Sequence, residues 1–167
     1  MTEKEKLSKA ENLFRKGVEC WSTPSQWNLR NALQYFESAS REGHLEAKLW
    51  AGYLYLYGLP QIQVNIEYAK KYLKQASECG LALATHYLFV LSLPKKMNQS
   101  LEYAQKAFEQ GYLYEANFLC DAYLYGWGTE INIQKAIEYN ACARTIGLPN
   151  AEIKYLELLY PRLFSNT

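Results

Sequence analysis

The sequence predicts an all-α protein, a right-handed α/α solenoid of four helix pairs preceded by an N-terminal capping helix. Glycine recurs at intervals of 37, 31 and 36 residues, and the residues at fixed distances from each of these glycines are alike in type: Gly43, Gly80, Gly111, Gly147. The apolar residues between them follow the 3.6-residue period of a helix, and no segment reads as a strand. Repeats of 31–37 residues are typical of stacked helix pairs.

Each of these glycines closes a predicted first helix of a pair. Asparagine, a favoured N-cap, stands fifteen residues before three of the four glycines, and lysine stands before the other: Asn28, Asn65, Lys96, Asn132. Alanine four residues before each glycine lets a partner helix approach closely: Ala39, Ala76, Ala107, Ala143. Tyrosine eight residues before lies at the edge of the buried face, where its hydroxyl finds a polar partner: Tyr35, Tyr72, Tyr103, Tyr139. The glycine supplies a left-handed C-cap.

A second helix is predicted to begin about two residues after each glycine. In the first repeat it contains residues 47–57 and is capped by Gly58, and in the third it contains residues 115–125 and is capped by Gly126. Each first helix and the second helix that follows it therefore form one antiparallel pair. The four repeats are expected at about residues 28–64, 65–97, 98–131 and 132–163.

The N-terminal segment reads as half a repeat. Residues 4–21 form an amphipathic helix that corresponds to a second helix with no first helix before it, and residues 22–25 form the turn that follows. This helix is expected to cap the stack. No linker rich in proline, glycine or serine divides the chain, so we expect residues 1–167 to form one helical-repeat domain that Pro161 brings to an end.

Composition excludes several classes of protein. The chain has 18 lysines and arginines against 17 aspartates and glutamates, and a net charge of +1 does not favour a dedicated nucleic-acid binder. The longest apolar stretch, residues 81–94, is too short to span a bilayer, and the charged N-terminus resembles no secretory signal. The four cysteines lack metal-ligand spacing and are expected to be free and mostly buried, with Cys142 nearest the solvent. We expect a cytoplasmic protein that uses no metal or cofactor.

The repeated residues resemble the Sel1-like repeats, a branch of the tetratricopeptide-like α/α solenoids. The first repeat carries the pattern most fully, in Ala32, Tyr35, Phe36, Ala39, Gly43, His44, Ala47, Gly52, Tyr55 and Gly58. The third repeat carries Tyr103, Ala107, Gly111, Tyr123, Gly126 and Gly128, whereas the second and fourth lack the Tyr-x-x-Gly-x-Gly ending. The resemblance implies protein binding, as an adaptor, scaffold, regulator or immunity-type partner. It implies no catalytic residues.

No motif in the sequence indicates an enzyme. There is no His-Glu-x-x-His, no Gly-x-Ser-x-Gly and no P-loop. His44 follows a capping glycine and is expected to have a structural role, and His86 lies inside a second helix. We therefore expect no catalytic residues in this chain.

The polar face of the first helices supplies most of the candidate binding residues. Stacked repeats would align this face into a strip, which by analogy with related solenoids lines the concave surface. Its candidates are Gln34, Glu37, Arg41, Lys71, Lys74, Glu78, Glu102, Gln105 and Glu109. The strip is mixed in charge at its N-terminal end and acidic towards its C-terminal end, which would suit a basic or amphipathic segment of a partner. The alternative is an ordinary solvated face.

Four aromatic residues lie outside the repeated core columns: Tyr68, Tyr112, Tyr114 and Trp127. The last three complete the candidate binding residues. Exposed tyrosine and tryptophan are enriched at binding hot spots. The alternative is irregular packing at the helix junctions.

The sequence thus predicts a non-catalytic protein-binding module, an intracellular inhibitor or immunity-type partner of one specific protein. A general adaptor or scaffold is the main alternative. A self-assembling protein is another, because Leu156, Leu159, Leu163 and Phe164 have no repeat after them. We expect a monomer or a weak dimer.

Overall fold

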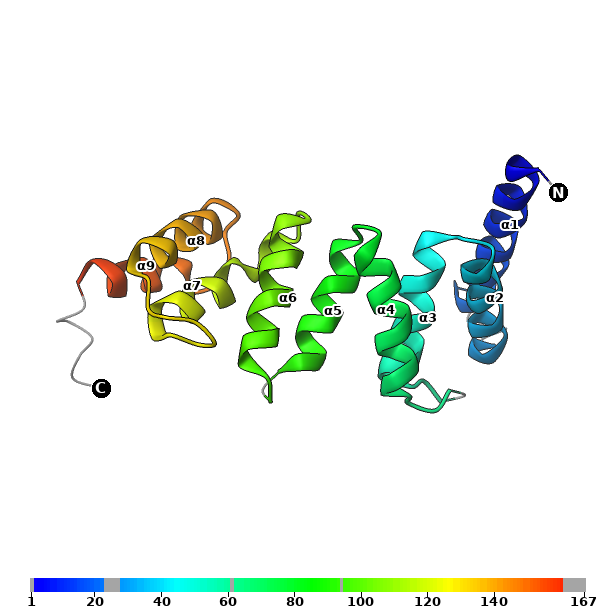
Figure 1. Ribbon diagram of the computed structural model, residues 1–167, viewed down its shortest axis with the longest axis horizontal. Coiled ribbons are helices and arrows are strands. Elements are labelled where there is room, and N and C mark those ends of the chain that lie inside the picture. The colour runs from blue at the N-terminus through cyan, green and yellow to red at the C-terminus, as the bar shows by residue number, and fades with distance from the viewer. Residues whose placement is uncertain (1, 23–27, 61, 94, 161–167) are drawn as a thin grey trace. The chain divides into compact units, whose positions relative to one another are not determined.

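The computed structural model describes residues 2–22, 28–60, 62–93 and 95–160, and within these residues the chain is helical and has no strand (Figure 1). The α-helices are α1 (Glu3–Ser22), α2 (Leu29–Arg41), α3 (Leu45–Tyr57), α4 (Ile66–Glu78), α5 (Ala82–Ser92), α6 (Met97–Glu109), α7 (Ala116–Tyr125), α8 (Ile133–Thr145) and α9 (Ala151–Leu159). A short 3₁₀ helix, η2 (Leu113–Glu115), precedes α7. The all-α prediction is confirmed for these residues.

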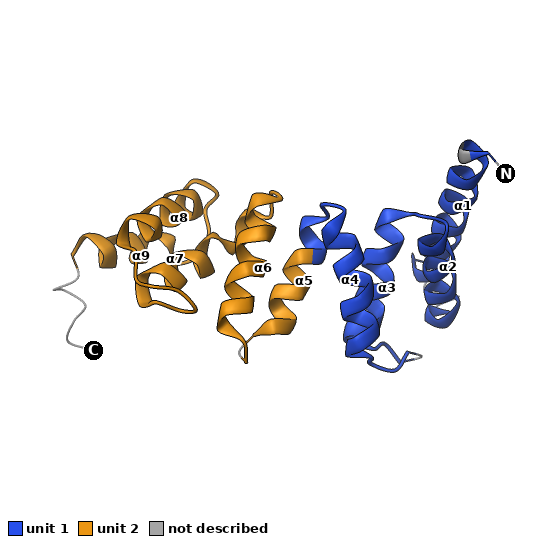
Figure 2. Ribbon diagram, in the orientation of Figure 1, with its two compact units in different colours: residues 1–84 blue, residues 85–167 orange. Residues whose placement is uncertain are grey.

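The chain divides into two compact units (Figure 2). Unit 1 comprises residues 1–84 and unit 2 comprises residues 85–167, so the boundary falls within α5. Each unit is described by itself below.

In unit 1, α1 packs along α2, and α3 packs against both α2 and α4. Phe36 and Leu54 are almost fully buried at the centre of this core. A Cβ atom on Gly17 of α1 would lie 2.6 Å from a ring carbon of Phe36, so only glycine allows α1 to approach α2 this closely. Trp21 of α1 packs edge-on against Trp50 of α3, with ring centroids 5.2 Å apart. The N-terminal helix therefore covers the first pair as predicted.

In unit 2, α7 packs against α8, and α8 packs against α9. Leu119 and Cys120 of α7 are fully buried, and Phe89 of α5 belongs to the same core. Asn140 of α8 is also fully buried, and its side-chain amide donates a hydrogen bond of 2.9 Å to the carbonyl oxygen of Ala151. This bond joins α8 to the start of α9.

The predicted helix caps are confirmed. The side chains of Asn28, Asn65 and Asn132 each accept a hydrogen bond of 3.0 Å from the backbone N–H group three residues further on. Lys96 occupies the same place before α6 and makes no such bond. The four repeat glycines have φ values between 70° and 98°, the left-handed region that a C-cap requires.

The second helices begin less regularly than predicted. Helices α3 and α5 begin two residues after their glycines, whereas the third repeat forms η2 first and α7 begins at Ala116. In the fourth repeat α9 begins at Ala151, because Asn150 before it has a left-handed φ of 63° that is incompatible with a helix. The turn predicted at residues 22–25 starts too early, because Ser22 is the last residue of α1. Residues 23–25, the stop at Pro161, and Leu163 and Phe164 lie outside the described residues.

The cysteines correct one expectation. All four are free, but Cys79 is the exposed one and Cys142 is only partly accessible. Cys79 is the C-cap residue of α4 and therefore lies at a helix end rather than on a face. The side chain of Cys142 packs beside the buried Ala143 and Ala151.

Candidate functional site

The candidate residues of unit 1 lie on α2 and α4. Gln34 and Arg41 are exposed on α2, and a set of three is exposed on α4: Lys71, Lys74, Glu78. Neither Lys71 nor Lys74 forms a hydrogen bond or ion pair with any described residue. Arg41 donates from Nε to the backbone carbonyl oxygen of Glu37, 3.3 Å away, and forms no ion pair with a described residue. These charges are available to a partner.

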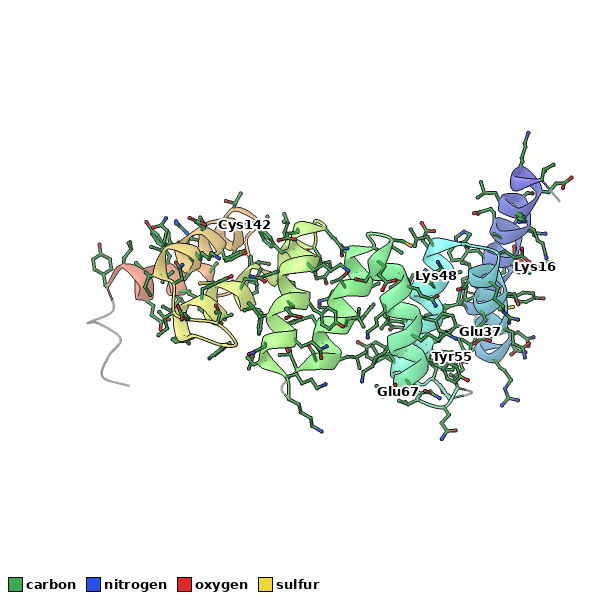
Figure 3. The ribbon with its side chains drawn as sticks, in the orientation of Figure 1. Lys16, Glu37, Lys48, Tyr55, Glu67 and Cys142 are labelled. Carbon is green, nitrogen blue, oxygen red and sulfur yellow. The ribbon has the colours of Figure 1, made fainter. Side chains whose placement is uncertain are left out.

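Glu37 differs from the other candidates of unit 1 because it is half-buried and accepts hydrogen bonds from two tyrosines. Figure 3 labels Glu37 together with one of these tyrosines, Tyr55. The hydroxyl of Tyr55 on α3 donates to Glu37 Oε1 at 2.8 Å, and the hydroxyl of Tyr72 on α4 donates to the same oxygen at 3.2 Å. No described lysine, arginine or histidine forms an ion pair with this carboxylate. The carboxylate therefore lies where α2, α3 and α4 meet.

Three tyrosine rings stack beside this carboxylate. The ring of Tyr55 lies 5.1 Å from that of Tyr68 and 6.0 Å from that of Tyr72, in both cases nearly parallel. Burial, followed by the charge of Glu37 and the hydrogen bond to it, raises the pKa of Tyr72 to about 12. Burial also raises the pKa of Tyr55, with the hydrogen bond to Glu37 as the second cause. We call Glu37, Tyr55, Tyr68 and Tyr72 the unit 1 tyrosine site.

Unit 2 repeats this arrangement with different polar groups. Gln105 of α6 donates to the Tyr123 hydroxyl at 2.5 Å, and the ring of Tyr123 stacks on that of Tyr139, with centroids 5.7 Å apart. Lys135 of α8 lies over the Tyr123 ring at 4.7 Å and donates to its hydroxyl at 3.3 Å. We call these four residues the unit 2 tyrosine site. In this site the ammonium group of Lys135 therefore already occupies one face of the Tyr123 ring.

The remaining strip candidates of unit 2 are acidic and exposed. Glu102 and Glu109 lie on α6, and neither forms an ion pair with a described residue. Burial is the main cause that raises the pKa of Tyr139, followed by the neighbouring Tyr123 and the charge of Glu109. This part of the strip carries the acidic character that the sequence predicts.

The three candidate aromatic residues lie in two separate places within unit 2. The rings of Tyr112 and Tyr114 lie 5.4 Å apart at η2, and Tyr114 is 67% exposed. Trp127 lies 5.6 Å from the ring of Tyr125 in the loop that follows α7, and it is 37% exposed. The structure therefore gives unit 2 two exposed aromatic groups.

A buried acid lies beneath Tyr112. Glu115 is 4% exposed and accepts a hydrogen bond of 2.5 Å from His86 Nδ1, while the His86 ring stacks on that of Tyr112 at 4.5 Å. Burial raises the pKa of Tyr112, and the charge of Glu115 raises it further. Alanine occupies the position of Glu115 in the other three repeats. The glutamate in place of the repeated alanine was the feature of the sequence that could have indicated the His86–Glu115 pair.

His44 has the structural role that was expected. Its Nδ1 accepts a hydrogen bond of 3.3 Å from the N–H of Ala47 at the start of α3, and its ring stacks on that of Phe14 at 4.2 Å. No group of three potential metal ligands occurs among the described residues. None of the helices in the described ranges has the length and hydrophobicity needed to cross a membrane.

Sequence reasoning missed the two tyrosine sites as units. It placed Tyr55 and Tyr72 in the repeat core and Glu37 on the solvated strip, whereas the structure joins all three. The signal was available, because Glu37 and Gln105 both stand six residues before a repeat glycine. Tyr68 and Lys135 likewise share one repeat position, because each stands twelve residues before a repeat glycine.

Solved structures of other proteins share this fold. A protective antigen of uropathogenic Escherichia coli with an SLR fold matches 92% of this chain at 22% identity and a TM-score of 0.78. A Sel1 repeat protein from Oxalobacter formigenes matches 90% at 21% identity and a TM-score of 0.75. The chain spans 34% of the first protein and 62% of the second. A comparison with curated protein sequences found no match.

The sequence also matches a repeat family directly. The Sel1 repeat is matched four times, at residues 22–44, 45–81, 82–112 and 116–143. The matched segments and the predicted repeats divide the same helices at different points. Each of the last three matched segments starts near the second helix of a pair, whereas each predicted repeat starts at a first helix. The matches cover most of the chain, and both structural relatives carry the repeat fold. The chain therefore belongs to the Sel1 repeat family.

Proposed function

We propose that this chain is a non-catalytic protein-binding module that inhibits, or confers immunity to, one specific protein in the cytoplasm. Sel1 repeat proteins typically mediate protein–protein interactions. The observation that carries the proposal is the set of exposed charges and aromatic rings at the candidate positions. A protein partner would cover these groups.

The unpaired charges suggest how a partner is recognised. Lys71 and Lys74 on α4 form no ion pair with the described residues, and neither do Glu102 and Glu109 on α6. Charges that are exposed and unpaired steer association and set specificity more than they add affinity. Unit 2 would favour a basic or amphipathic segment, with Tyr114 as an aromatic anchor beside it.

A pull-down from extract of the native cells tests the proposal. The tagged full chain is compared with K71E/K74E and with K6E/K16E, a control that makes the same charge change on α1. We expect one stoichiometric partner, captured by the wild type and the control and at least about tenfold less by K71E/K74E. Equal capture by all three proteins would remove the strip of unit 1 from the binding surface.

The same experiment separates the inhibitor from the adaptor. A single partner whose activity falls when the purified chain is added supports an inhibitor. Several substoichiometric partners would instead support a general adaptor or scaffold, and the absence of any partner would contradict a protein-binding role. Fractionation of the native cells tests the cytoplasmic location.

A further inference from the structure

We propose that the unit 1 tyrosine site binds one cationic side chain, a lysine or an arginine, of the partner protein. The inference rests on the proposed function, because it names the chemistry of one contact made by that partner. It follows from three features of the site: a carboxylate with no ion-pair partner among the described residues, an exposed ring stacked on one of its tyrosine donors, and the equivalent site of unit 2.

The carboxylate of Glu37 has a free oxygen. Both tyrosine hydroxyls donate to Oε1, and no described group donates to Oε2. Arg41 lies one turn further along α2, yet its Nε donates to the backbone carbonyl of Glu37 rather than to the carboxylate. A half-buried carboxylate attracts a cation more strongly than a fully solvated one, because less water screens the charge. Oε2 is therefore a ready acceptor.

Tyr68 supplies an aromatic platform next to Tyr55, one of the two donors to Glu37. Its ring is 48% exposed and stacks on the ring of Tyr55, whose hydroxyl donates to Glu37. Lysine and arginine side chains bind to tyrosine faces by cation–π attraction, and arginine also stacks in parallel with the ring. A cation paired with Oε2 would thus have a ring surface within its reach.

Unit 2 contains the same arrangement with the cation already supplied by the chain. Lys135 occupies the position of Tyr68, and its ammonium group lies 4.7 Å from the Tyr123 ring centroid. Gln105, which is neutral, occupies the position of Glu37. One site therefore carries a lysine and an amide, and the other carries a carboxylate that forms no ion pair within the described part of the chain. The difference indicates that the cation of unit 1 comes from outside the chain.

Two arginines on α2 limit what can bind. Arg30 lines a hollow of about 370 Å³ together with Tyr55 and Asn65. The positive charge of Arg41 acts on Tyr72, where it offsets a small part of the rise in pKa that burial and Glu37 cause. The two arginines flank Glu37 in the sequence, seven residues before it and four after it. A run of lysines would be repelled by both arginines, whereas one cationic residue among neutral or acidic neighbours would not. The site therefore selects an isolated cation.

A direct test uses N-acetyl-arginine amide as the probe and N-acetyl-citrulline amide as its neutral isostere. The full chain carries ¹³C-labelled tyrosine rings, and their NMR signals are followed during titration. We expect millimolar, saturable shifts of Tyr55, Tyr68 and Tyr72 with the arginine probe and none with citrulline. E37Q, in which the amide oxygen still accepts both hydroxyl hydrogen bonds, should weaken binding at least about tenfold.

Two exchanges between the sites sharpen the test. Y68K places in unit 1 the lysine that unit 2 has, so an internal cation should compete and abolish probe binding. Q105E/K135Y gives unit 2 the composition of unit 1, so the Tyr123 and Tyr139 signals should then respond to the probe. Far-UV circular dichroism confirms that each variant is folded.

The outcomes distinguish this inference from the proposed function. Equal shifts with citrulline, or undiminished binding to E37Q, would overturn the cation site even where a partner is captured from extract. Probe binding that follows the expected pattern, in a chain that captures no partner, would support the site and count against the proposed function.

Discussion

Truncation of Tyr72 to alanine tests the packing of unit 1. The ring packs against the unit 1 core, stacks on Tyr55 at 6.0 Å and donates to Glu37 at 3.2 Å. Loss of a half-buried ring costs about 1.5 kcal/mol, roughly half of what full burial would cost. Loss of the stacking costs about 0.5 kcal/mol. Loss of a hydrogen bond to a carboxylate that keeps its second donor costs about 1 kcal/mol. We therefore expect Y72A to lower the free energy of unfolding by about 3 kcal/mol.

Two conservative variants separate these contributions. Y72F removes only the hydroxyl and should cost about 1 kcal/mol. Y139F is the matched control in unit 2, because the Tyr139 ring stacks in the same way but its hydroxyl bonds to no described residue, so the cost should stay below about 0.5 kcal/mol.

Urea unfolding followed by circular dichroism measures all three variants. With a slope of about 2 kcal/mol per M, Y72A should lower the midpoint at which unit 1 unfolds by about 1.5 M. An unchanged midpoint for Y72A would refute the repeat alignment on which Tyr72 was placed. Equal effects of Y72F and Y139F would refute the role assigned to the bond with Glu37.

Three further results are expected. The pKa of Tyr72 is about 12 in the folded chain and about 10 in the unfolded chain. The stability that this difference contributes is therefore fully present below pH 10 and is lost as the pH rises towards 12. The melting temperature should fall across this range, and it should fall less in Y72F. K96N should raise the free energy of unfolding, measured by urea titration, by about 1 kcal/mol, because it supplies the N-cap side chain that α6 lacks. An unchanged free energy of unfolding would contradict the cap assignment. Ellman's reagent should modify the exposed Cys79 within minutes but Cys120 only after unfolding, because burial raises the pKa of Cys120 to about 11. Mass spectrometry identifies the modified thiol, and early labelling of Cys120 would contradict its burial.

The helices were predictable because each boundary has a local cause. Asn65 and Gly80 mark the start and end of α4 through one side-chain hydrogen bond and one left-handed residue, and both act over only a few residues. The late start of α9 was harder to foresee. It depends on a left-handed Asn150, a conformation that asparagine tolerates but does not require.

The candidate site was only partly predictable because its key contacts join residues far apart in the sequence. A helical wheel places Glu37 on the polar face of α2, but the wheel does not show that tyrosines from α3 and α4 reach it. The strip candidates remain predictions at residue level. The exposure of Cys79 was missed because an argument from helix faces does not apply to a C-cap residue, which follows the last residue of the helix.

The paired tyrosine sites have a consequence for how the repeats can vary. The rings of Tyr123 and Tyr139 repeat the stacking of Tyr55 and Tyr72, while the neighbouring polar groups differ between the two copies. Glutamate or glutamine fits beside the hydroxyls, and tyrosine or lysine fits beside the ring. Substitutions at these two positions alter charge and hydrogen bonding without disturbing the stack. Two repeats built on the same stacked rings can thus carry different charges and hydrogen-bonding groups at two positions while they keep the same scaffold.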